Sequence, residues 1–296
     1  MFGLNSSLFL LFLLVVSGSA LAEIPKANIA VIGGTFLNDA LLESGILTES
    51  FRVDTKIGES PLIHYGKIDE VPFYYVHGHG GAKYLQAWAA LYELGVQEAV
   101  GGATAGAINP VMKTYDFVAV DDFIDLNTQR PRRFPQEVTE KEGLILARYV
   151  PAIDPLVKDL LFKSTLKVIR TDEALDTINV FDKGVVLQAA GGRFETAAEI
   201  KSYAGMGGDL VTMSVGTEMS YARQLGINYA CLVIISNPAE GIAPWEFSDL
   251  SEIYQTLNPV SLEILKDVIP KLADLPAKGR VDEPLRIHPT MSKNKE

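Results

Sequence analysis

The chain has 296 residues, of which 48% are hydrophobic, and its formal net charge is −11 at pH 7. A chain of this length and composition can bury one large core or two modest ones. The negative charge argues against a surface that binds nucleic acid, because a polyanion would be repelled, but a small local ligand site remains possible. The single cysteine, Cys231, lies in an apolar run, which favours a buried strand residue and excludes an intrachain disulfide. No CxxC or HExxH pattern predicts a metal site.

Residues 1–22 have the pattern of a secretion signal. An apolar core spans residues 8–16 and small residues follow at Ala20 and Ala22, which predicts cleavage just before Glu23. The core is too short to be a permanent membrane anchor. No Lys or Arg precedes it, so only the terminal amine is positive there, which departs from the usual pattern. We expect the mature chain to be soluble and exported, either periplasmic or secreted.

The next part of the chain alternates apolar runs with glycine-rich turns. A buried strand that ends in Gly-Gly-Thr is expected over 29–35, a hairpin over 62–76 and a helix over 82–94. The strand that follows is expected to give way to a loop of small residues, GGATAGAINP, within 96–110. A bare backbone lets a flat ligand or an anion approach closely. A crowded strand–helix crossover without a ligand is the alternative.

The stretch 189–226 carries the clearest site pattern. An apolar strand breaks at two glycines, and Glu195 follows at the first turn of a helix. A second strand delivers Met213 and Ser214 to a loop, and we expect Thr217 to cap the next helix. Ligands bind where strands end at this edge of an open α/β sheet. From the pattern alone, two ordinary strand–helix turns with one exposed acid fit equally well.

The other apolar runs complete an α/β pattern. Further strands are expected over 117–120, 177–190 and 229–235, and further helices over 155–167 and 250–272. We therefore predict one α/β domain over 23–276. Residues 277–296 have scattered charge, little periodicity and two prolines, which indicates a surface tail or a disordered end.

The letters FET followed by AAE (194–199), then MS and VGTE (213–218) and ARQLG (222–226) carry a family resemblance. This part of the chain is similar to the trimeric purine nucleoside phosphorylase and methylthioadenosine phosphorylase family, and the matching order extends from Ile29 to about Gly241. The resemblance implies a single-domain mixed central β-sheet flanked by helices. It also implies a homotrimer, a purine nucleoside substrate, phosphate as co-substrate and no cofactor.

The resemblance assigns two catalytic residues, both of which would contact the purine base. Glu195 matches the glutamate that grips the N1 edge of the purine, and Phe194 beside it is assigned to substrate binding. Asn237 matches an asparagine that hydrogen-bonds N7 and O6 of the leaving base in members that prefer oxopurines. The methylthioadenosine branch has aspartate at that position. Because a carboxamide both donates and accepts hydrogen bonds, Asn237 favours a 6-oxopurine.

The remaining roles concern the sugar and the phosphate. The resemblance assigns Met213 and Tyr84 to the ribose, Thr104 and Ala105 to a backbone that faces base and phosphate, and Thr35, His79 and Ser214 to the phosphate. Without the resemblance, the glycine turn before Phe36 is equally well explained as a tight turn with an idle hydroxyl.

The loop HGHGG, residues 77–81, departs from the family, in which an arginine and a histidine of this loop bind phosphate. The arginine is missing here, and a histidine is only partly charged near neutral pH. Phosphate affinity should therefore be weaker, or phosphate is not the co-substrate. His77 and His79 could also be metal ligands, although no third ligand is evident nearby, or exposed histidines without a chemical role.

A second departure lies in the segment RPRRFP, residues 130–135. Its RFP letters match a family loop that extends toward a neighbouring subunit, but the aromatic residue which that loop lends to the ribose pocket has no clear counterpart. Arg130 or Pro131 stands at its place. The simplest interpretation of Arg130, Arg132 and Arg133 is a solvated basic loop.

The sequence leaves three functions open. A nucleoside phosphorylase uses phosphate as nucleophile, a nucleoside hydrolase on the same fold uses water, and an exported binding protein retains the purine without turnover. No Ser-His-Asp set or pair of carboxylates is placed for a covalent sugar intermediate, which favours direct displacement.

Overall fold

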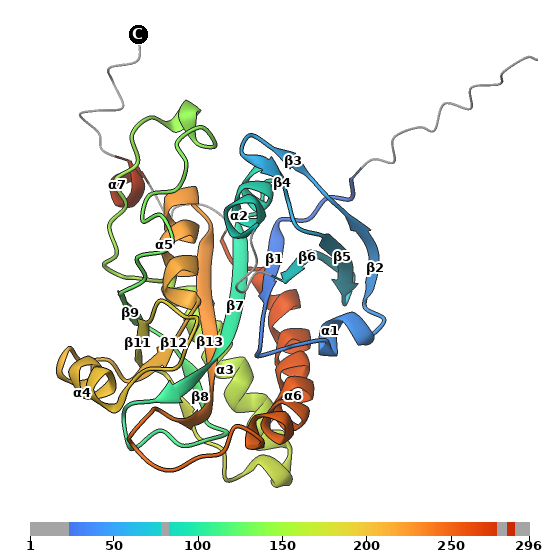
Figure 1. Ribbon diagram of the computed structural model, residues 1–296. Helices are drawn as coiled ribbons and strands as arrows, with labels where there is room; N and C mark the ends of the chain where they lie inside the picture. The colour runs from blue at the N-terminus through green and yellow to red at the C-terminus, as the bar shows by residue number, and fades with distance from the viewer. Residues whose placement is uncertain (1–23, 78–82, 277–282, 288–296) are drawn as a thin grey trace, which may run out of the picture.

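The computed structural model describes residues 24–77, 83–276 and 283–287, in which a mixed β-sheet is flanked by helices (Figure 1). The expected secretion signal and His79 lie outside these residues. The strands of the main sheet are β1 (Ile29–Gly33), β2 (Leu47–Phe51), β5 (Ile63–Ile68), β6 (Val71–His77), β7 (Glu98–Ala107), β8 (Phe117–Ala119), β9 (Asp122–Asp125), β10 (Val180–Phe181), β11 (Val185–Gln188), β12 (Leu210–Thr212) and β13 (Asn228–Pro238). Two short strands, β3 (Asp54–Thr55) and β4 (Gly58–Glu59), pair separately.

The α-helices in the described part of the chain are α1 (Ala40–Glu43), α2 (Tyr84–Glu93), α3 (Pro155–Thr171), α4 (Ala197–Gly205), α5 (Val215–Leu225), α6 (Asp249–Leu272) and α7 (Glu283–Arg286). Two single 3₁₀ turns, Glu140–Glu142 and Glu173–Leu175, lie in the connections. None of the helices described is both long enough and apolar enough to cross a membrane. This α/β arrangement confirms the fold class predicted from the sequence.

The order of the main sheet is β10-β8-β13-β7-β1-β6-β5-β2, with β12 also pairing to β7, and β11 lying between β12 and β9. The central pairs β6–β1, β1–β7 and β7–β13 are all parallel. Their carboxyl ends therefore meet at one edge of the sheet, where loops and helix starts can surround a ligand. The expected hairpin is confirmed as the antiparallel pair β5–β6.

Strand β7 differs from the prediction, because it continues through the glycines and alanines that we expected to form a loop. It pairs with β13 from Glu98 to Ala107, so the small residues belong to the centre of the sheet. Their small size makes room for aromatic rings. A Cβ at Gly101 would lie 2.2 Å from the Tyr229 hydroxyl, and one at Gly102 would lie 2.6 Å from the ring of Phe36.

These two glycines also show that helices cover both faces of the sheet. Successive residues of a strand point to opposite faces. Gly101 faces Tyr229 and Glu218 of α5, whereas Gly102 faces Phe36. With its carboxamide turned to donate, Asn258 of α6 reaches the Phe36 carbonyl at 3.2 Å, which places α6 on the side opposite α5. Helix α3 packs against α6.

Helix α5 begins earlier than we expected. Its N-cap position is Ser214, and Thr217 lies within the first turn instead of capping it. Thr217 has a different role, because its amide donates to Gln188 Oε1 at 2.7 Å and its hydroxyl accepts from Gln188 Nε2 at 2.6 Å. This buried reciprocal pair joins the end of β11 to the start of α5. It fixes Ser214 relative to the strand edge.

The last described segment, residues 283–287, packs against the rest of the chain, although we expected a surface tail or a disordered end there. The buried Arg286 side chain donates to the Gln224 carbonyl at 3.0 Å and pairs with Glu142 at 2.8 Å. The Arg148 amide donates to the Leu285 carbonyl at 2.7 Å. Cys231, in contrast, is fully buried in β13 as expected, and burial raises the pKa of its thiol.

Candidate active site

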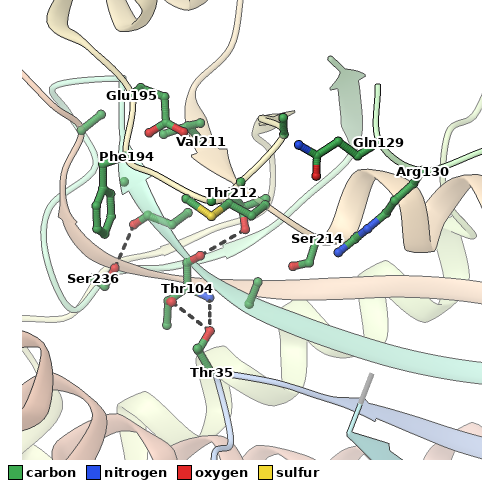
Figure 2. A pocket seen from close by; sticks show the side chains of 18 of the residues that line it. Thr35, Thr104, Gln129, Arg130, Phe194, Glu195, Val211, Thr212, Ser214 and Ser236 are labelled. Atoms are coloured by element: carbon green, nitrogen blue, oxygen red, sulfur yellow. Dashed lines mark hydrogen bonds between the residues drawn. The ribbon is translucent and has the colours of Figure 1, made fainter. Parts of the chain in front are cut away.

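A cavity of about 740 Å³ opens at the edge where β1, β7, β12 and β13 end. Every predicted site residue in the described part of the chain lines it: Thr35, Tyr84, Thr104, Ala105, Phe194, Glu195, Met213, Ser214 and Asn237. These residues come from distant parts of the sequence. Figure 2 shows Phe194 and Glu195 at one side, Ser214 at the other, and Thr35 and Thr104 beneath them.

One end of the cavity is rich in hydroxyl groups. Thr35 and Thr104 share a hydrogen bond of 2.9 Å between their hydroxyls, and the Thr104 amide donates to Thr35 Oγ1 at 3.1 Å. The Thr212 hydroxyl donates to the Thr104 carbonyl at 3.2 Å (Figure 2). Ser214, buried at the N-cap of α5, completes this end. The partial positive charge of a helix N-terminus favours an anion there.

The side-chain amides of Asn38 and Asn258 stabilise the turn that contains Thr35. Asn38 Nδ2 donates to the Thr35 carbonyl at 3.2 Å, and the Asn38 amide donates to the Gly34 carbonyl at 2.8 Å. Asn258 of α6, oriented to donate, reaches the same Thr35 carbonyl at 3.3 Å. Its oxygen then accepts from Asn38 at 2.7 Å. These contacts fix the turn, so Thr35 presents its hydroxyl without reorganising.

The opposite end of the cavity contains the half-buried Glu195. Gly191 and Gly192, with φ of 85° and 82°, turn the chain after β11 in a conformation that favours glycine. Thr196 and Glu199 then form a capping box at the start of α4, and Arg193 pairs with Glu199 at 2.7 Å. This ion pair and the cap lower the pKa of Glu199 to about 2. The turn that presents Glu195 is thus fixed on both sides.

The electrostatic environment of Glu195 differs from that of Glu199. Burial is the main cause that raises the pKa of Glu195, and the neighbouring carboxylates of Glu199 and Glu240 raise it further. Arg193 acts in the opposite direction but pairs with Glu199. Glu195 is therefore a partly desolvated carboxylate whose acceptor oxygens are available to a ligand. Such groups cluster at functional sites.

Asn237 lines the same cavity from near the end of β13. The register with β7 shifts between Ile235 and Asn237, and this irregularity allows both Ser236 and Asn237 to line the cavity. The Ser236 hydroxyl donates to Asn237 Oδ1 at 2.8 Å, and Asn237 Nδ2 donates to the Pro238 carbonyl at 2.9 Å. The Ser236 bond orients the carboxamide, so its oxygen and nitrogen are distinguished.

Phe194 and Tyr84 provide the aromatic walls of the cavity. Phe194 is 43% exposed and packs edge-on against Trp245 with the ring centroids 5.5 Å apart, which places it at the mouth. Tyr84 is only 7% exposed and packs against Tyr221 of α5 at 5.6 Å. Burial raises the pKa of the Tyr84 hydroxyl, which therefore stays neutral.

Arg130 is the main residue that our sequence analysis placed incorrectly. We expected a solvated basic loop, and Arg132 and Arg133 are indeed exposed. Arg130 instead lines the cavity with its guanidinium carbon 4.2 Å from the centre of the Tyr84 ring. No periodicity distinguishes it from the neighbouring arginines. Its only sequence signal is its place where the family loop enters a pocket.

Other lining residues that were missed include Gln86, Gln129, Glu240 and Tyr254. Tyr254 belongs to α6, and its hydroxyl lies 3.5 Å from the Thr104 hydroxyl. Its helical spacing indicated only a core helix. In the part of the chain that the structure describes, no group of three His, Cys, Asp or Glu residues could hold a metal ion. His77 is exposed, with its Nδ1 3.4 Å from the Tyr75 hydroxyl, and does not line the cavity.

Comparison with known proteins adds independent evidence. The model of the phosphorylase superfamily matches residues 28–270. A 6-oxopurine nucleoside phosphorylase of Pyrococcus furiosus is 28% identical over 268 residues, which cover 86% of this chain and 95% of that protein. A probable 6-oxopurine nucleoside phosphorylase of Dictyoglomus turgidum is 30% identical over 258 residues, covering 83% and 92%.

Solved structures show the same fold. A methylthioadenosine phosphorylase from an antarctic soil metagenomic library superimposes with a TM-score of 0.75 at 22% identity, covering 90% of this chain and 94% of the other. The methylthioadenosine phosphorylase of Schistosoma mansoni in complex with adenine gives 0.72 at 20% identity, covering 85% and 93%. These structures share the fold, and the family match over residues 28–270 establishes that the chain belongs to the phosphorylase superfamily.

Proposed function

We propose that this protein is a purine nucleoside phosphorylase that cleaves the N-glycosidic bond of a 6-oxopurine nucleoside with phosphate as the nucleophile. One observation carries the proposal: Glu195 and Asn237, brought from separate elements, share a cavity whose other end is formed by the hydroxyls of Thr35, Thr104 and Ser214. The first end suits the edges of a purine, and the second suits an anion. The relatives named 6-oxopurine nucleoside phosphorylases support this assignment.

The reaction requires the site to recognise charge as it develops. A phosphate oxygen bonds to C1′ of the sugar while the bond from C1′ to the purine nitrogen breaks, and the bonding pair leaves with the base. Asn237 Nδ2 can turn from the Pro238 carbonyl, 2.9 Å away, to donate to N7 as the purine becomes negative. The products are ribose 1-phosphate and the free base.

The preference for an oxo group at position 6 follows from donors and acceptors. A 6-oxopurine carries a hydrogen on N1, which the Glu195 carboxylate accepts. A 6-aminopurine presents a lone pair at N1, which an ionised carboxylate repels. The carboxamide of Asn237 can donate to both N7 and an oxo group. Both side chains therefore select the same class of base.

The test uses inosine with and without phosphate, and measures hypoxanthine and ribose 1-phosphate by chromatography. We expect both products only when phosphate is present, and slower turnover of adenosine. Hypoxanthine release without phosphate would identify a hydrolase and contradict the proposal. Saturable binding of inosine without release would identify a binding protein, and would also contradict it.

We also propose that the mature chain acts as a homotrimer outside the cytoplasm. The family resemblance supports the trimer, and the apolar N-terminal segment with its Ala-x-Ala pattern supports export. Light scattering of the purified protein should give three times the mass of one chain, and a monomer would contradict this. Mass spectrometry of protein recovered from the expressing cells should show a chain that begins at Glu23, and an intact N-terminus would argue against export.

A further inference from the structure

The charge distribution of the cavity is asymmetric. Its carboxylates, Glu195 and Glu240, lie at the end assigned to the base. Among the described residues that line the cavity, Arg130 is the one cationic side chain. Figure 2 shows it opposite Glu195, with its guanidinium pointing toward the hydroxyl of Ser214. A positive charge thus stands at the end that is rich in hydroxyls.

The guanidinium of Arg130 also has unused hydrogen-bonding capacity. Its Nη1 atom is buried and has no hydrogen-bond partner among the described residues, and no described acid forms an ion pair with it. The guanidinium carbon lies over the Tyr84 ring, 4.2 Å from its centroid, and this contact does not use the Nη1 hydrogens, which are available to another partner. Arg130 as a whole is partly buried, and a partly desolvated cation without a counter-charge is unfavourable. An anion in the cavity would supply that charge.

The backbone around Arg130 is fixed on both sides. The buried Asn127 side chain accepts from the Gln129 amide at 2.8 Å and from the Arg130 amide at 3.2 Å. On the other side, the Tyr221 hydroxyl of α5 donates to the Pro131 carbonyl at 2.6 Å. The neighbouring exposed arginines, Arg132 and Arg133, do not line the cavity. Arg130 is therefore held in place before a ligand arrives.

We propose that Arg130 is the cation that binds the phosphate co-substrate, with its guanidinium edge facing the anion held by Thr35, Thr104 and Ser214. This inference rests on the proposed function for the identity of the anion, but the predicted anion site can be measured without the reaction. A planar guanidinium offers two parallel N–H donors to a tetrahedral oxyanion, and it stays charged at every physiological pH. Phosphate binding by this chain accordingly depends on the loop between β9 and α3.

A structural role is the rival explanation, because Arg130 also packs on Tyr84. Arg130→Met keeps a long apolar chain on the ring and removes the charge. Arg130→Lys restores a charge without the planar fork. Arg133→Met is the matched control, since Arg133 is exposed in the same loop and lies outside the cavity.

Steady-state kinetics with phosphate and inosine varied separately distinguish the two roles. In Arg130→Met we expect the KM for phosphate to rise about 10- to 100-fold, the effect of losing a charged hydrogen-bond partner, with a change of less than about threefold in the KM for inosine. Arg130→Lys should recover part of the loss, and Arg133→Met should match the wild type. An unchanged KM for phosphate in Arg130→Met, or a rise confined to inosine, would overturn the inference.

Binding of sulfate alone, measured by calorimetry, separates this inference from the proposed function. We expect the wild type and Arg133→Met to bind sulfate, and Arg130→Met to bind it about tenfold or more weakly. If wild-type turnover proves independent of phosphate but this pattern holds, the proposed function fails and the anion site stands. If Arg130→Met binds sulfate as the wild type does, the anion site is wrong even when phosphorolysis is confirmed. Should Arg130→Met not fold, the same comparison is made with Arg130→Lys, which must bind sulfate more weakly than the wild type.

Discussion

At the scale of single residues, the site depends on the state of two carboxylates, Glu195 and Glu199, four positions apart in the same turn. Glu199 is paired with Arg193 and caps α4, so its pKa is depressed to about 2 and it remains ionised. Glu195 is partly desolvated, so its pKa is raised. The first carboxylate holds the turn, and in the proposed function the second meets the purine base. The dependence of inosine turnover on pH can detect this division of roles.

We predict that inosine turnover has an acid limb that belongs to Glu195. The protonated carboxyl is a poor acceptor for N1–H, so kcat/KM should fall as the pH drops through the raised pKa of Glu195. Glu195→Gln should lower kcat/KM about 10- to 100-fold at neutral pH and remove that limb. The measurement is kcat/KM for inosine across the acid range, and identical profiles for the two proteins would contradict the prediction.

The thermal stability of Glu195→Gln is the control for this prediction. A carboxyl whose pKa is raised by folding stabilises the folded state below its unfolded pKa, and this stabilisation is lost as the pH rises through the folded pKa. At neutral pH Glu195 therefore contributes no favourable ionisation energy to folding. Glu195→Gln should unfold at the same temperature as the wild type or slightly higher, so a loss of activity cannot be assigned to unfolding.

A second residue-scale prediction concerns Asn237. In Asn237→Asp, an ionised carboxylate replaces the donor to N7 and faces the Pro238 carbonyl that Nδ2 now contacts at 2.9 Å. We expect kcat/KM for inosine to fall about 10- to 100-fold, and the ratio of inosine to adenosine turnover to shift toward adenosine. Competing the two nucleosides in one assay measures the ratio directly. A ratio that stays the same would mean that Asn237 does not read position 6.

At the scale of elements, the sheet depends on small residues at its centre. A methyl group at Gly101 would meet the Tyr229 hydroxyl at 2.2 Å and Glu218 Oε2 at 2.8 Å, and the Tyr229 hydroxyl already donates to that oxygen at 2.5 Å. We predict that Gly101→Ala lowers the free energy of unfolding by about 1–3 kcal/mol through overpacking. Denaturant unfolding is the measurement.

Gly205, the last residue of α4, is the matched control for Gly101. Nothing lies within 4 Å of a Cβ built there, and its φ is not positive. Gly205→Ala should leave the free energy of unfolding unchanged or raise it by up to about 1 kcal/mol. If the free energies of unfolding of Gly101→Ala and Gly205→Ala were equal, the close packing that we describe between β7 and α5 would be contradicted.

Elements also show where sequence-based prediction fails. Strand existence was predictable from apolar runs, as for β1 and the β5–β6 hairpin. The extent of β7 was not, because a glycine-rich run has no apolar signal and only its pairing with β13 makes it a strand. Thr217 has the residue type of a helix cap, but its partner Gln188 comes from another element, so its actual role depends on tertiary packing.

At the scale of the whole molecule, the cavity exists because parallel strands end together. The residues at their ends could be assigned from motifs, and Glu195, Asn237, Thr35 and Ser214 all reach one cavity. Arg130 could not be assigned, since its position depends on contacts with Tyr84 and Tyr221, which are far from the loop in the sequence. Local sequence motifs therefore predicted residues that line the cavity, but they did not predict the positive charge of Arg130 there.

The central claim is that one cavity holds the base between Glu195 and Asn237 and an anion at the hydroxyl end. A crystal structure of the protein with hypoxanthine and sulfate tests it most directly. We predict that the N1 edge of the base meets the Glu195 carboxylate, its N7 meets Asn237, and the sulfate contacts Thr35 and Ser214. A base bound with neither side chain at its edges, or a sulfate bound outside this cavity, would contradict the account.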